Sequence, residues 1–477
     1  MTSPVHADKT VLAALPPAQA AVVHDLARAF ADAGAELYLV GGILRDVLLG
    51  RELPGDLDFA TDALPERTQE LGRAAGADAV YLVGERFGTV GLVFGTHAPI
   101  HVEITTYRRE HYPDETRHPA VEHVGSLTED LARRDFTVNA IAADAKTGEL
   151  VDPFGGEADL ALSILRAVGD PDERFAEDPL RLLRAARLVA QLGFRIDWPT
   201  FEAMQRGAPN LARISKERMN AELTKLLCGD FAAHGLDALF DTGLLTEAMP
   251  ELAPMADEAT GRPGIHREKD LWEHTMRVVE RTPARPVVRW AALLHDAAKP
   301  LTRSVDEFGE VHFFGHERVG ADLATCLLRR LKADKATRNA VARLVELHLR
   351  PAAYEPDWTD SAVRRLMLEA DGVLDDLLDL VAADVTSARE YKQREAAARV
   401  AALRAHIARV EEELALAQLT SPLDGDELMA MFDRPPGRWI AVIKDALREL
   451  VIDGALEPWD KVGAARIARE MVEQSIE

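Results

Sequence analysis

Residues 37–59 read LYLVGGILRDVLLGRELPGDLDF, and this stretch decides the fold of the first part of the chain. An apolar strand runs into a pair of glycines, and a second strand carries two carboxylates. Because successive side chains on a strand point to opposite faces, Asp56 and Asp58 are expected to project from the same face. Adjacent carboxylates repel each other unless a cation lies between them. Mg²⁺ held by a few carboxylate oxygens keeps positions open for phosphate oxygens, so the pair predicts a metal site that handles a triphosphate.

The glycine turn before these carboxylates fits the same interpretation. Gly41 and Gly42 lack a Cβ, so the backbone can turn tightly and approach a phosphate, with Arg45 placed to neutralise charge. A D-x-D pattern alone is common on solvated strand edges. The ordered combination of apolar strand, G-G-x-x-R-D and D-x-D-F, however, resembles the head domain of the nucleotidyltransferase superfamily, in the branch of tRNA nucleotidyltransferases and bacterial poly(A) polymerases. The resemblance implies that Gly42 and Arg45 bind the nucleotide.

Composition indicates an ordinary globular protein of roughly two to four domains, with 477 residues of which 47% are hydrophobic and 29% charged. The two cysteines, Cys228 and Cys326, lie in apolar helical surroundings, which favours buried thiols in a reducing compartment. We find neither a basic leader followed by an apolar stretch nor an apolar run of about 18 residues. The expected location is the cytoplasm, with no membrane partner.

Net charge is unusual for a protein that binds nucleic acid, because 56 basic residues face 80 acidic ones, for a formal charge of −24. Binding to a phosphate backbone needs only a local basic track, and an acidic remainder would suppress unselective binding. Basic side chains do cluster between residues 130 and 220, as Arg133, Arg134, Arg181, Arg184, Arg187, Arg206, Arg213, Lys216 and Arg218.

Hydrophobic periodicity predicts an α+β, multidomain protein. A helix is expected over 17–34, ending at Gly34. Short β-rich runs then alternate with helix-like segments, which predicts a head with a mixed sheet: strands at 37–40, 57–60, 79–83, 89–94 and 100–106, and helices at 44–49, 66–75 and 128–134. Helical periodicity follows from about residue 175 almost to the end, including a long amphipathic stretch over about 383–418.

Four domains are expected from this organisation. They are a nucleotidyltransferase head over 1–160, an all-helical neck over 161–256, a helical body over 265–390 and a helical tail over 391–477, with a linker around 257–264.

A third carboxylate is needed for polymerase-type chemistry with two metal ions, and Glu103 in HVEITTYR (101–108) is the best candidate. Its apolar neighbours Val102 and Ile104 are expected to face the other way. Together with Asp56 and Asp58 it could hold one ion on the triphosphate and another on an attacking hydroxyl. The alternative is a glutamate that simply faces solvent from a strand.

Residues 129–140, EDLARRDFTVNA, closely resemble the R-R-D-F-T-x-N-A signature of the same family. The resemblance implies that Arg134 contacts the nucleotide and that Asp135 lies by the ribose, where a carboxylate accepts a hydrogen bond from a 2′-hydroxyl. Arg133 is expected to pair with Glu129 or Asp130. Residues 107–127 resemble the family's flexible loop, and the full length of this loop argues against a variant that adds only the two cytidines.

Residues 177–187, EDPLRLLRAAR, are expected to form a helix with Pro179 in its first turn. Asp178 and Arg181 would then share a face at i and i+3. The alternative is a helix-start acid with a structural arginine ladder. Cytosine and adenine both present an amino donor beside a ring-nitrogen acceptor, and uracil and guanine present the reverse, so one carboxylate beside one guanidinium accepts C and A.

The same segment resembles the E-D-x-x-R motif of class II tRNA nucleotidyltransferases. This resemblance implies that Asp178 and Arg181 read the base and that Arg184 and Arg187 help to hold the triphosphate. The segment from Ser215 through Arg218 resembles a further helix of this family, and the resemblance implies that this helix shapes the pocket.

Histidines and carboxylates form a second constellation downstream, in the order H…HD…D. The candidate metal ligands are His274, His295, Asp296 and Asp384, with His316 and His348 nearby in the sequence. Imidazoles with carboxylates suit Mn²⁺, Fe²⁺, Ni²⁺ or Zn²⁺ better than Mg²⁺. The segment resembles an HD-type metal phosphohydrolase domain, although Ala297-Ala298 replace the commoner Ile-Gly. Whether the site hydrolyses phosphoesters, or is a retained scaffold, stays open.

The resemblance covers essentially the whole chain and is that of class II CCA-adding tRNA nucleotidyltransferases with an HD domain. It implies addition of CMP, CMP and AMP from CTP and ATP to the 3′ end of tRNA, with Mg²⁺ as cofactor and release of pyrophosphate. No obligate protein partner is implied. Two alternatives stay open: an A-adding enzyme or poly(A) polymerase, and an HD phosphohydrolase whose head only binds nucleotides or RNA.

Overall fold

The computed structural model describes residues 11–51, 53, 55–83, 88–111, 120–123, 125–256, 271–385, 390–413 and 420–474. The chain divides into two compact units, Met1–Ala248 and Met249–Glu477. Among the described helices, none has both the length and the apolar character needed to cross a bilayer.

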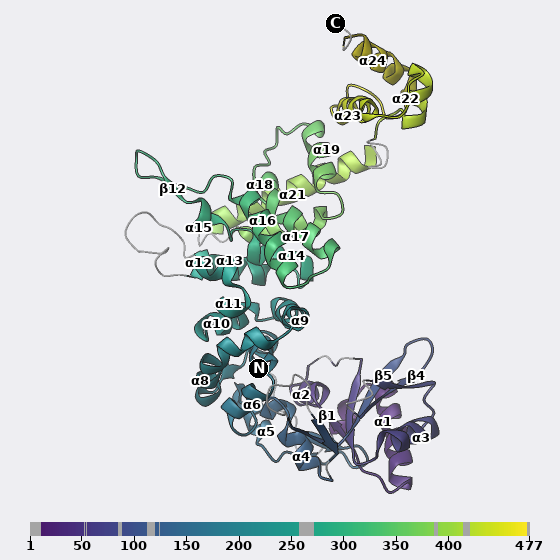
Figure 1. Ribbon diagram of the computed structural model, residues 1–477, viewed down its shortest axis with the longest axis vertical. Coiled ribbons are helices and arrows are strands. Elements are labelled where there is room, and N and C mark those ends of the chain that lie inside the picture. Colours follow the sequence, from purple (N-terminus) through teal and green to yellow (C-terminus); the bar gives the residue numbers. More distant parts are fainter. Residues whose placement is uncertain are drawn as a thin grey trace. The chain divides into compact units, whose positions relative to one another are not determined.

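A seven-stranded mixed sheet forms the centre of the head (Figure 1). Its strands are, in spatial order, β3 (Ala79–Val83), β4 (Thr89–Phe94), β5 (Ile100–Thr106), β2 (Leu57–Thr61), β1 (Leu37–Val40), β8 (Ala142–Asp144) and β9 (Leu150–Val151). Strands β2 and β5 run parallel, and the other neighbouring pairs run antiparallel. The five predicted head strands are therefore confirmed.

Helices cover the apolar face of this sheet. The buried side chains Leu57, Val102 and Ile104 alternate with exposed ones along β2 and β5. Helices α1 (Pro17–Asp32) and α3 (Pro65–Ala74) pack against each other, and α3 also packs on β3, β4 and β5. The predicted helix end is confirmed, because α1 finishes two residues before Gly34, which has a positive φ of 71°.

The opposite face of the sheet is only half covered. Val40 and Ala60 are buried there against Leu127 and Leu131, two residues of α4 (Leu127–Ala132). The half of this face formed by β2 and β5 keeps the exposed side chains of Asp58, His101 and Glu103. Three shorter elements complete the head: α2 (Gly42–Leu48), α5 (Gly156–Leu162) and the hairpin of β6 (Arg108–His111) with β7 (Ala120–His123). Residues 112–119 of the loop that resembles the family's flexible loop lie outside the described residues.

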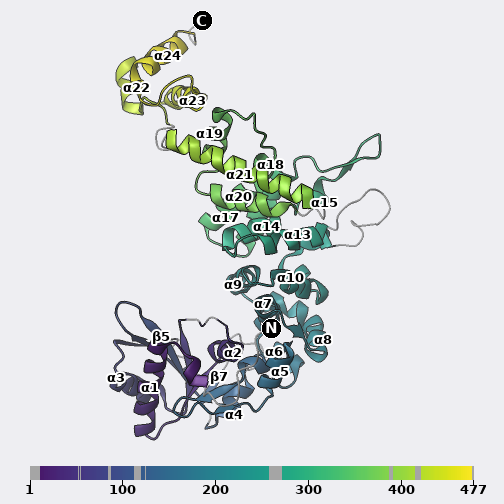
Figure 2. The same cartoon turned by 180° about the vertical axis from the view of Figure 1, so that it is seen from behind.

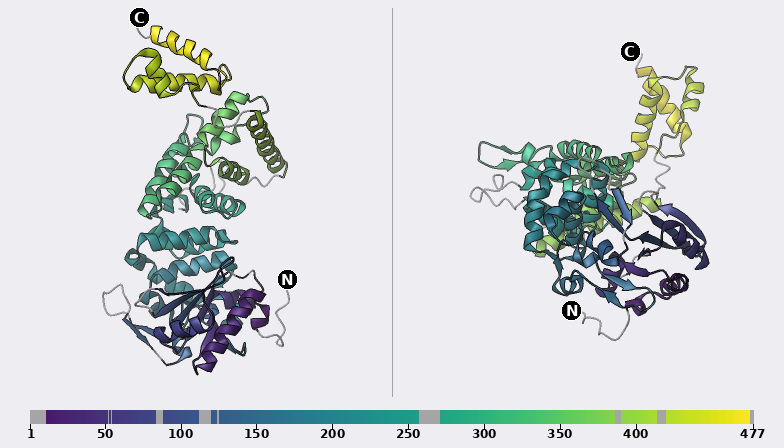
Figure 3. Two further views of the ribbon diagram at one scale, coloured as in Figure 1. Left: turned by 90° about the vertical axis from the view of Figure 1, so that its right-hand side faces the viewer. Right: turned by 60° about the horizontal axis from the view of Figure 1, so that its bottom comes forward.

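The neck is a layer of helices, seen in teal in Figure 3. Its members are α6 (Pro171–Glu177), α7 (Leu180–Leu192), α8 (Trp198–Gly207), α9 (Lys216–Leu227), α10 (Ala232–Asp241) and α11 (Leu244–Ala248). Helix α7 lies at its centre, in contact with α9 and α10. The prediction of an all-helical neck is wrong in one detail, since β10 (Ile164–Leu165) and β11 (Arg195–Ile196) form a short parallel pair.

The second unit is built on helices α13 (Leu271–Arg281), α14 (Pro286–Leu294), α16 (His316–Arg330), α17 (Lys335–Leu347) and α20 (Leu374–Asp384). Its largest fully buried side chain is Trp290, on α14. The unit also contains α12 (Ala253–Ala256), α15 (Lys299–Thr302), α18 (Leu349–Ala352), α19 (Asp360–Glu369) and the hairpin of β12 (Ser304–Val305) with β13 (Val311–His312). The predicted linker at 257–264 lies outside the described residues.

Helix α21 (Glu390–Glu413) lies along α18 and α20, as Figure 2 shows from behind. The predicted stretch over 383–418 is not one helix, because Asp384 is the last residue of α20 and α21 begins at Glu390. The final helices α22 (Gly425–Phe432), α23 (Arg438–Ile452) and α24 (Lys461–Gln474) pack around a core of their own that includes Leu428 and Leu447.

The prediction of two buried thiols is wrong. Cys326 is exposed and Cys228 is half-buried. Position 326 lies on α16 one residue before the buried pair Leu327 and Leu328, and it therefore falls on the outer side of that helix.

Candidate active site and metal-ligand cluster

The glycine turn after β1 lies directly against the carboxylate of Asp58. Gly41 has a φ of 83°, and a Cβ at this position would lie 3.3 Å from Oδ2 of Asp58 and 3.8 Å from Nη1 of Arg134. Glycine takes this backbone conformation without strain, and the absence of a Cβ avoids a tight contact with Asp58. The turn, the carboxylate and the guanidinium therefore lie together, and the predicted approach of this backbone to a phosphate stays a prediction.

The three predicted carboxylates come from neighbouring strands. Asp58 on β2 is the direct register partner of Glu103 on the parallel strand β5. Asp56 lies one residue before β2 begins, two residues from Asp58. All three side chains are exposed on the uncovered half of the sheet. Glu103 faces Gly91 on its other side, so the adjacent strand contributes no Cβ to this face.

This arrangement changes the acidity of Asp58. Surrounding protein, which partly removes the carboxyl group from water, and the negative charge of Glu103 raise its pKa to about 6. Asp56 adds to the rise, and the nearby Arg134 offsets part of it. A carboxylate that is costly to ionise alone is a strong ligand once a cation is beside it, as a divalent metal site requires.

Arg133 and Arg134 both turn toward the buried carboxylate of Asp130. Nη2 of Arg133 lies 2.8 Å from Oδ1, which confirms the predicted pairing, and Nη2 of Arg134 lies 3.4 Å from Oδ2. Burial lowers the pKa of Arg134, and the charge of Asp130 opposes this. Arg134 thus stands beside Gly41 and Asp58, held by Asp130, and its predicted contact with the nucleotide stays a prediction.

A chain of polar groups, with Asn139 and Asp135 buried at its centre, joins the helix after the glycine turn to the neck. Nη1 of Arg45 donates to Oδ1 of Asn139 at 2.8 Å, and Nδ2 of Asn139 donates to Oδ1 of Asp135 at 3.0 Å. Oδ2 of Asp135 then accepts from Nε and Nη2 of Arg184, at 2.8 and 2.5 Å. Arg45 also donates to both carboxylate oxygens of Asp46.

Asp135 is enclosed by these partners. Burial by itself would raise its pKa, but the charge of Arg184 and the hydrogen bonds from Asn139 and Arg184 hold the pKa well below its usual range. The backbone N–H of Phe136 also donates to Oδ1, at 2.9 Å. Both oxygens are therefore engaged inside the protein, and a direct contact with a ribose hydroxyl would have to share or displace one of these bonds.

The predicted helix over 177–187 is interrupted. Helix α6 ends at Glu177 and α7 begins at Leu180, with Asp178 in an extended conformation (φ −139°, ψ 98°). Proline disfavours the helical region for the residue before it, so Pro179 forces the break at Asp178. The expectation that Asp178 and Arg181 share a helix face is therefore wrong, because Asp178 precedes the helix that carries Arg181.

Each of these two residues has another partner. Oδ2 of Asp178 accepts from Nη2 of Arg218 at 2.8 Å, so the Ser215–Arg218 segment at the start of α9 does reach this residue. Nη1 of Arg181 donates to Oε2 of Glu177 at 2.6 Å, and its Nη2 donates to the carbonyl of Arg133 at 2.9 Å. Arg181 thereby connects the neck to the motif that carries Arg134.

Arg187 pairs with Glu222 of α9, Nε to Oε2, at 2.6 Å. Glu222 is not among the site residues predicted from the sequence. Its position on an otherwise apolar helix face is nevertheless a signal for such a pair, because an acidic residue there is rarely buried without a partner. Seven members of the predicted basic cluster pair with a carboxylate of the same unit: Arg133, Arg134, Arg181, Arg184, Arg187, Arg206 and Arg218.

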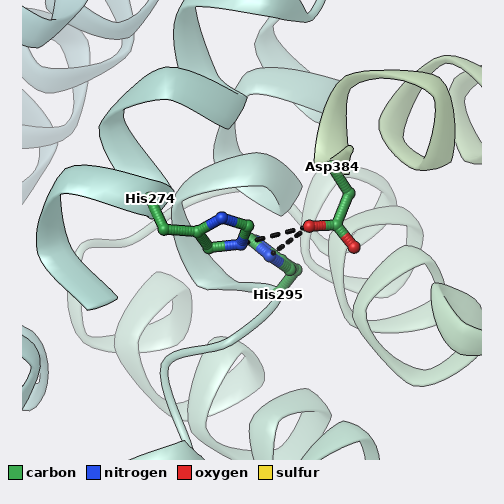
Figure 4. Close-up of side chains that lie close together, drawn as sticks. All are labelled: His274, His295 and Asp384. Carbon is green, nitrogen blue, oxygen red and sulfur yellow. Dashed lines mark ion pairs between the residues drawn. The ribbon is translucent and has the colours of Figure 1, made fainter. Parts of the chain in front are cut away.

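The second constellation is assembled from segments that are distant in sequence. His274 projects from α13, His295 follows the end of α14, and Asp384 is the last residue of α20 (Figure 4). Nε2 of His274 and Nε2 of His295 lie 3.1 and 3.5 Å from Oδ1 of Asp384. Oδ2 of the buried Asp296 lies 3.4 and 3.2 Å from the same two nitrogens. The four predicted ligands are thus brought together.

The carboxylates of this cluster stabilise a positive charge on its histidines. Burial would lower the pKa of His295, but the negative charge of Asp296 and contacts with Asp296 and Asp384 raise it to about 10. The raised pKa of His295 shows that the surrounding carboxylates favour a positive charge at this position. Imidazole and carboxylate together form a donor set that suits transition metals, so the residues fit the predicted ion.

Three stretches of the chain match families of known proteins. Residues 37–166 match the Poly A polymerase head domain. Residues 193–255 match the family described as Probable RNA and SrmB- binding site of polymerase A. Residues 271–389 match the HD domain.

Two curated relatives align over most of the chain. A CCA-adding enzyme of Geobacillus sp. (strain WCH70) is 34% identical over 428 residues, 89% of this chain and 90% of the relative. An A-adding tRNA nucleotidyltransferase of Deinococcus radiodurans is 35% identical over 449 residues, 91% of this chain and 94% of the relative. A solved structure, the Bacillus stearothermophilus CCA-adding enzyme in complex with CTP, is 29% identical with a TM-score of 0.71. That alignment covers 97% of this chain and 100% of the solved one.

Proposed function

Because the chain belongs to the family of CCA-adding tRNA nucleotidyltransferases, we propose that it adds CMP, CMP and AMP from CTP and ATP to the 3′ end of tRNA. The observation that carries the proposal is the pairing of Asp58 with Glu103 on adjacent parallel strands, with the Gly41 turn against Asp58. An exposed group of carboxylates beside a glycine turn fits a metal-bound triphosphate.

In the proposed reaction the 3′-hydroxyl oxygen of tRNA attacks the α-phosphorus of the nucleotide. The bond from that phosphorus to the bridging oxygen of the β-phosphate breaks, pyrophosphate leaves, and the hydroxyl proton would pass to Glu103 or to a metal-bound hydroxide. Asp56, Asp58 and Glu103 would hold Mg²⁺, which supplies charge stabilisation at the attacking and leaving oxygens. Gly42 and Arg45 would position the triphosphate, and Arg134 would contact the nucleotide from the side of Asp58.

Base selection is assigned to the neck. Asp178 as acceptor and Arg181 as donor would read the edge that cytosine and adenine share, with Arg184 and Arg187 toward the triphosphate. Arg218 and Glu177, which hold Asp178 and Arg181 respectively, would fix the directions of the two reading groups. The four-domain division, with 1–160 as head, 161–256 as neck, 265–390 as body and 391–477 as a tail that binds tRNA, is part of the proposal. The cytoplasm is the proposed compartment.

The test uses the full chain with three tRNA transcripts, which end at the discriminator nucleotide, at the first C and at the second C. Each is given CTP, ATP, UTP or GTP singly and in pairs. We expect successive incorporation of two CMP and one AMP, with UTP and GTP unused. AMP added only to the transcript that already ends in CC would establish the A-adding alternative, which the Deinococcus relative keeps in view.

The catalytic assignment is tested in the same assay. Asp58→Asn and Glu103→Gln should each abolish incorporation, because they remove a metal-binding charge while preserving shape. The matched control is Asp32→Asn, an exposed carboxylate on α1 away from the sheet face. Incorporation that survives in both site variants would contradict the assignment of the head.

A second function is favoured by the histidine cluster. We propose that His274, His295, Asp296 and Asp384 bind one divalent transition-metal ion and that this HD site hydrolyses phosphoesters. His295→Gln should remove the ion and any phosphatase activity toward a chromogenic phosphomonoester, and should leave CMP incorporation intact. Retained metal content in this variant would refute the proposed ligand set.

A further inference from the structure

Tyr81 is an exposed aromatic residue on β3, which is an edge strand of the head sheet. Its side chain is 44% exposed. A single exposed aromatic side chain on a protein surface needs no explanation by itself. What distinguishes Tyr81 is its position relative to the proposed catalytic carboxylates, which follows from the register of four strands.

Tyr81 lies in the same row across the sheet as two of those carboxylates. Its register partner is Gly91 on β4, and the partner of Gly91 on β5 is Glu103. Glu103 in turn is the partner of Asp58 on β2. Register partners on adjacent strands project from the same face of a sheet. Tyr81 therefore projects from the face that carries Glu103 and Asp58.

The ring of Tyr81 leans over Gly91, the residue that separates it from Glu103. A Cβ at position 91 would lie 2.5 Å from Cζ of Tyr81 and 2.9 Å from its hydroxyl oxygen. A side chain there would push the ring away, so the glycine leaves the room that the ring occupies. Cβ atoms of register partners lie about 4.5–5.5 Å apart, so the hydroxyl end of Tyr81 lies within about 8 Å of Cβ of Glu103. A nucleotide held at Glu103 is large enough to contact this ring.

The contact between Tyr81 and Gly91 also has a purely structural explanation. An aromatic side chain that packs over a glycine on the neighbouring strand compensates for the missing side chain and stabilises the sheet. That role predicts that a substitution of Tyr81 changes the free energy of unfolding and nothing else. A role in binding RNA predicts a change in the kinetics toward one substrate only, so the two roles can be separated by measurement.

The two ends of the row differ in what they can hold. The Gly41 turn and Arg134 lie against Asp58, on the side of the row where β1 borders β2. In the proposed reaction the triphosphate binds at this end. The attacking 3′-hydroxyl must approach the α-phosphorus opposite the leaving pyrophosphate, because the displacement is in line. The opposite end of the row is the one with Glu103 and Tyr81.

We infer that the ring of Tyr81 binds the 3′-terminal nucleotide of the RNA acceptor by stacking on its base. The inference rests on the proposed nucleotidyl transfer and assigns a residue to the acceptor side of that site. The ring would hold the terminal nucleotide in place while its 3′-hydroxyl lies at Glu103.

Stacking suits an acceptor whose last base changes during the reaction. The terminal base is that of the discriminator nucleotide before the first addition and a cytosine afterwards. A site that read the hydrogen-bonding edge of this base would accept some of these acceptors and reject others. An aromatic ring accepts all of them, because every base has a π-face.

The test compares Tyr81→Leu and Tyr81→Phe in the full chain, by steady-state incorporation on the three tRNA transcripts. Leucine has no π-face, so kcat/KM for tRNA should fall about tenfold or more on every transcript. KM for CTP should stay within about twofold, because CTP binds at the other end of the row. Tyr81→Phe keeps the ring and should retain most of the activity.

Leu82→Ala is the matched control. Leu82 is the next residue on the same strand, is 46% exposed and projects from the opposite face. This variant reports what a weaker edge strand does by itself, and it should leave kcat/KM for tRNA unchanged. Urea unfolding of each variant measures the structural contribution separately.

An unchanged kcat/KM for tRNA in Tyr81→Leu would overturn the inference and leave the proposed reaction standing, since the unmodified chain would still incorporate CMP. An equal fall in Tyr81→Phe would also overturn it, because the hydroxyl and not the ring would then be the contact. No incorporation by the unmodified chain would reject the proposed reaction and the inference together.

A cross-linking experiment on the unmodified chain decides the same question even if Tyr81→Leu fails to fold. It uses a tRNA transcript whose terminal nucleotide is 5-iodouridine, because light joins iodouracil to an aromatic ring that stacks on it. We expect mass spectrometry to find the cross-link on the peptide that contains Tyr81. A cross-link on a different peptide would overturn the inference.

Discussion

Asp135→Asn tests whether this carboxylate positions Arg184 or touches the ribose. The substitution preserves shape, and the amide oxygen can still accept from Phe136 and Asn139. The new amide NH₂ then faces the guanidinium of Arg184, donor against donor. Two charge-assisted hydrogen bonds are lost, at 2.8 and 2.5 Å in the unmodified chain.

The expected loss of stability follows from these contacts. Each charge-assisted bond contributes about 1.5–3 kcal/mol, and the variant also avoids burying a charge, which offsets part of the loss. The side chain of Arg184 is 36% exposed and can reach water. We therefore expect a decrease of about 2 kcal/mol in the free energy of unfolding of the unit that contains the head and neck.

The assay combines urea unfolding with incorporation of CTP and of dCTP. A misplaced Arg184 should slow both nucleotides by a similar factor. The pKa of Asp135 is held below its usual range, so its stabilising effect is present above pH ~4 and is lost as the pH falls toward its lowered pKa. The stability difference between variant and unmodified chain should shrink in acid accordingly.

The matched control is Asp172→Asn, which breaks a doubly hydrogen-bonded pair with Arg206 that is exposed on both sides. It should change neither stability nor incorporation measurably. The positioning role is refuted if Asp135→Asn leaves stability unchanged while dCTP gains on CTP by tenfold or more. That outcome would establish the direct ribose contact.

Three further predictions concern the same unit. Gly41→Ala should abolish incorporation, because a Cβ would lie 3.3 Å from Oδ2 of Asp58. Gly34→Ala is the control, because Gly34 has a similar positive φ and nothing within 4 Å of the added Cβ; it should lower the free energy of unfolding by about 1 kcal/mol and leave incorporation intact. Equal activities of the two variants would contradict the crowding argument. Mg²⁺ affinity, measured by calorimetry, should fall by up to about tenfold per pH unit below pH 6, because Asp58 with its pKa of about 6 takes up a competing proton; a flat profile from pH 5 to 8 would contradict it. Arg218→Gln should free Asp178 and raise misincorporation of UMP about tenfold, measured with UTP as sole nucleotide, while Arg206→Gln should not.

The alternation of apolar and polar residues predicted the strands of the head well, because these strands are short and the alternation along them is strong. Strands β1, β3, β4 and β5 have the expected bounds. The same alternation placed Asp58 and Glu103 on exposed faces of separate strands. Their direct pairing depends on β2 and β5 being neighbours in the sheet, which strand order decides and alternation does not.

The neck was harder to predict because its contacts join residues far apart in sequence. Pro179 disfavours a helical conformation at Asp178 and therefore indicates a break there. The helical pattern of the residues after Pro179 favoured an unbroken helix instead. The partnership of Asp178 with Arg218 spans 40 residues, and that of Asp135 with Arg184 spans 49. Such pairs depend on how the helices pack against each other. A single sequence therefore indicates which residues are candidates for pairing, and it does not indicate which two residues pair.

The histidine cluster bears on how this protein is made. The proposed metal ligands come from α13, the end of α14 and the end of α20, spread over residues 274–384. Metal ions bound by these segments would stabilise the fold of the second unit. They could do so only late in synthesis, once Asp384 has left the ribosome. Cells starved of transition metals would then hold a less stable form of the chain, more open to proteases, so metal supply would set how much of it accumulates.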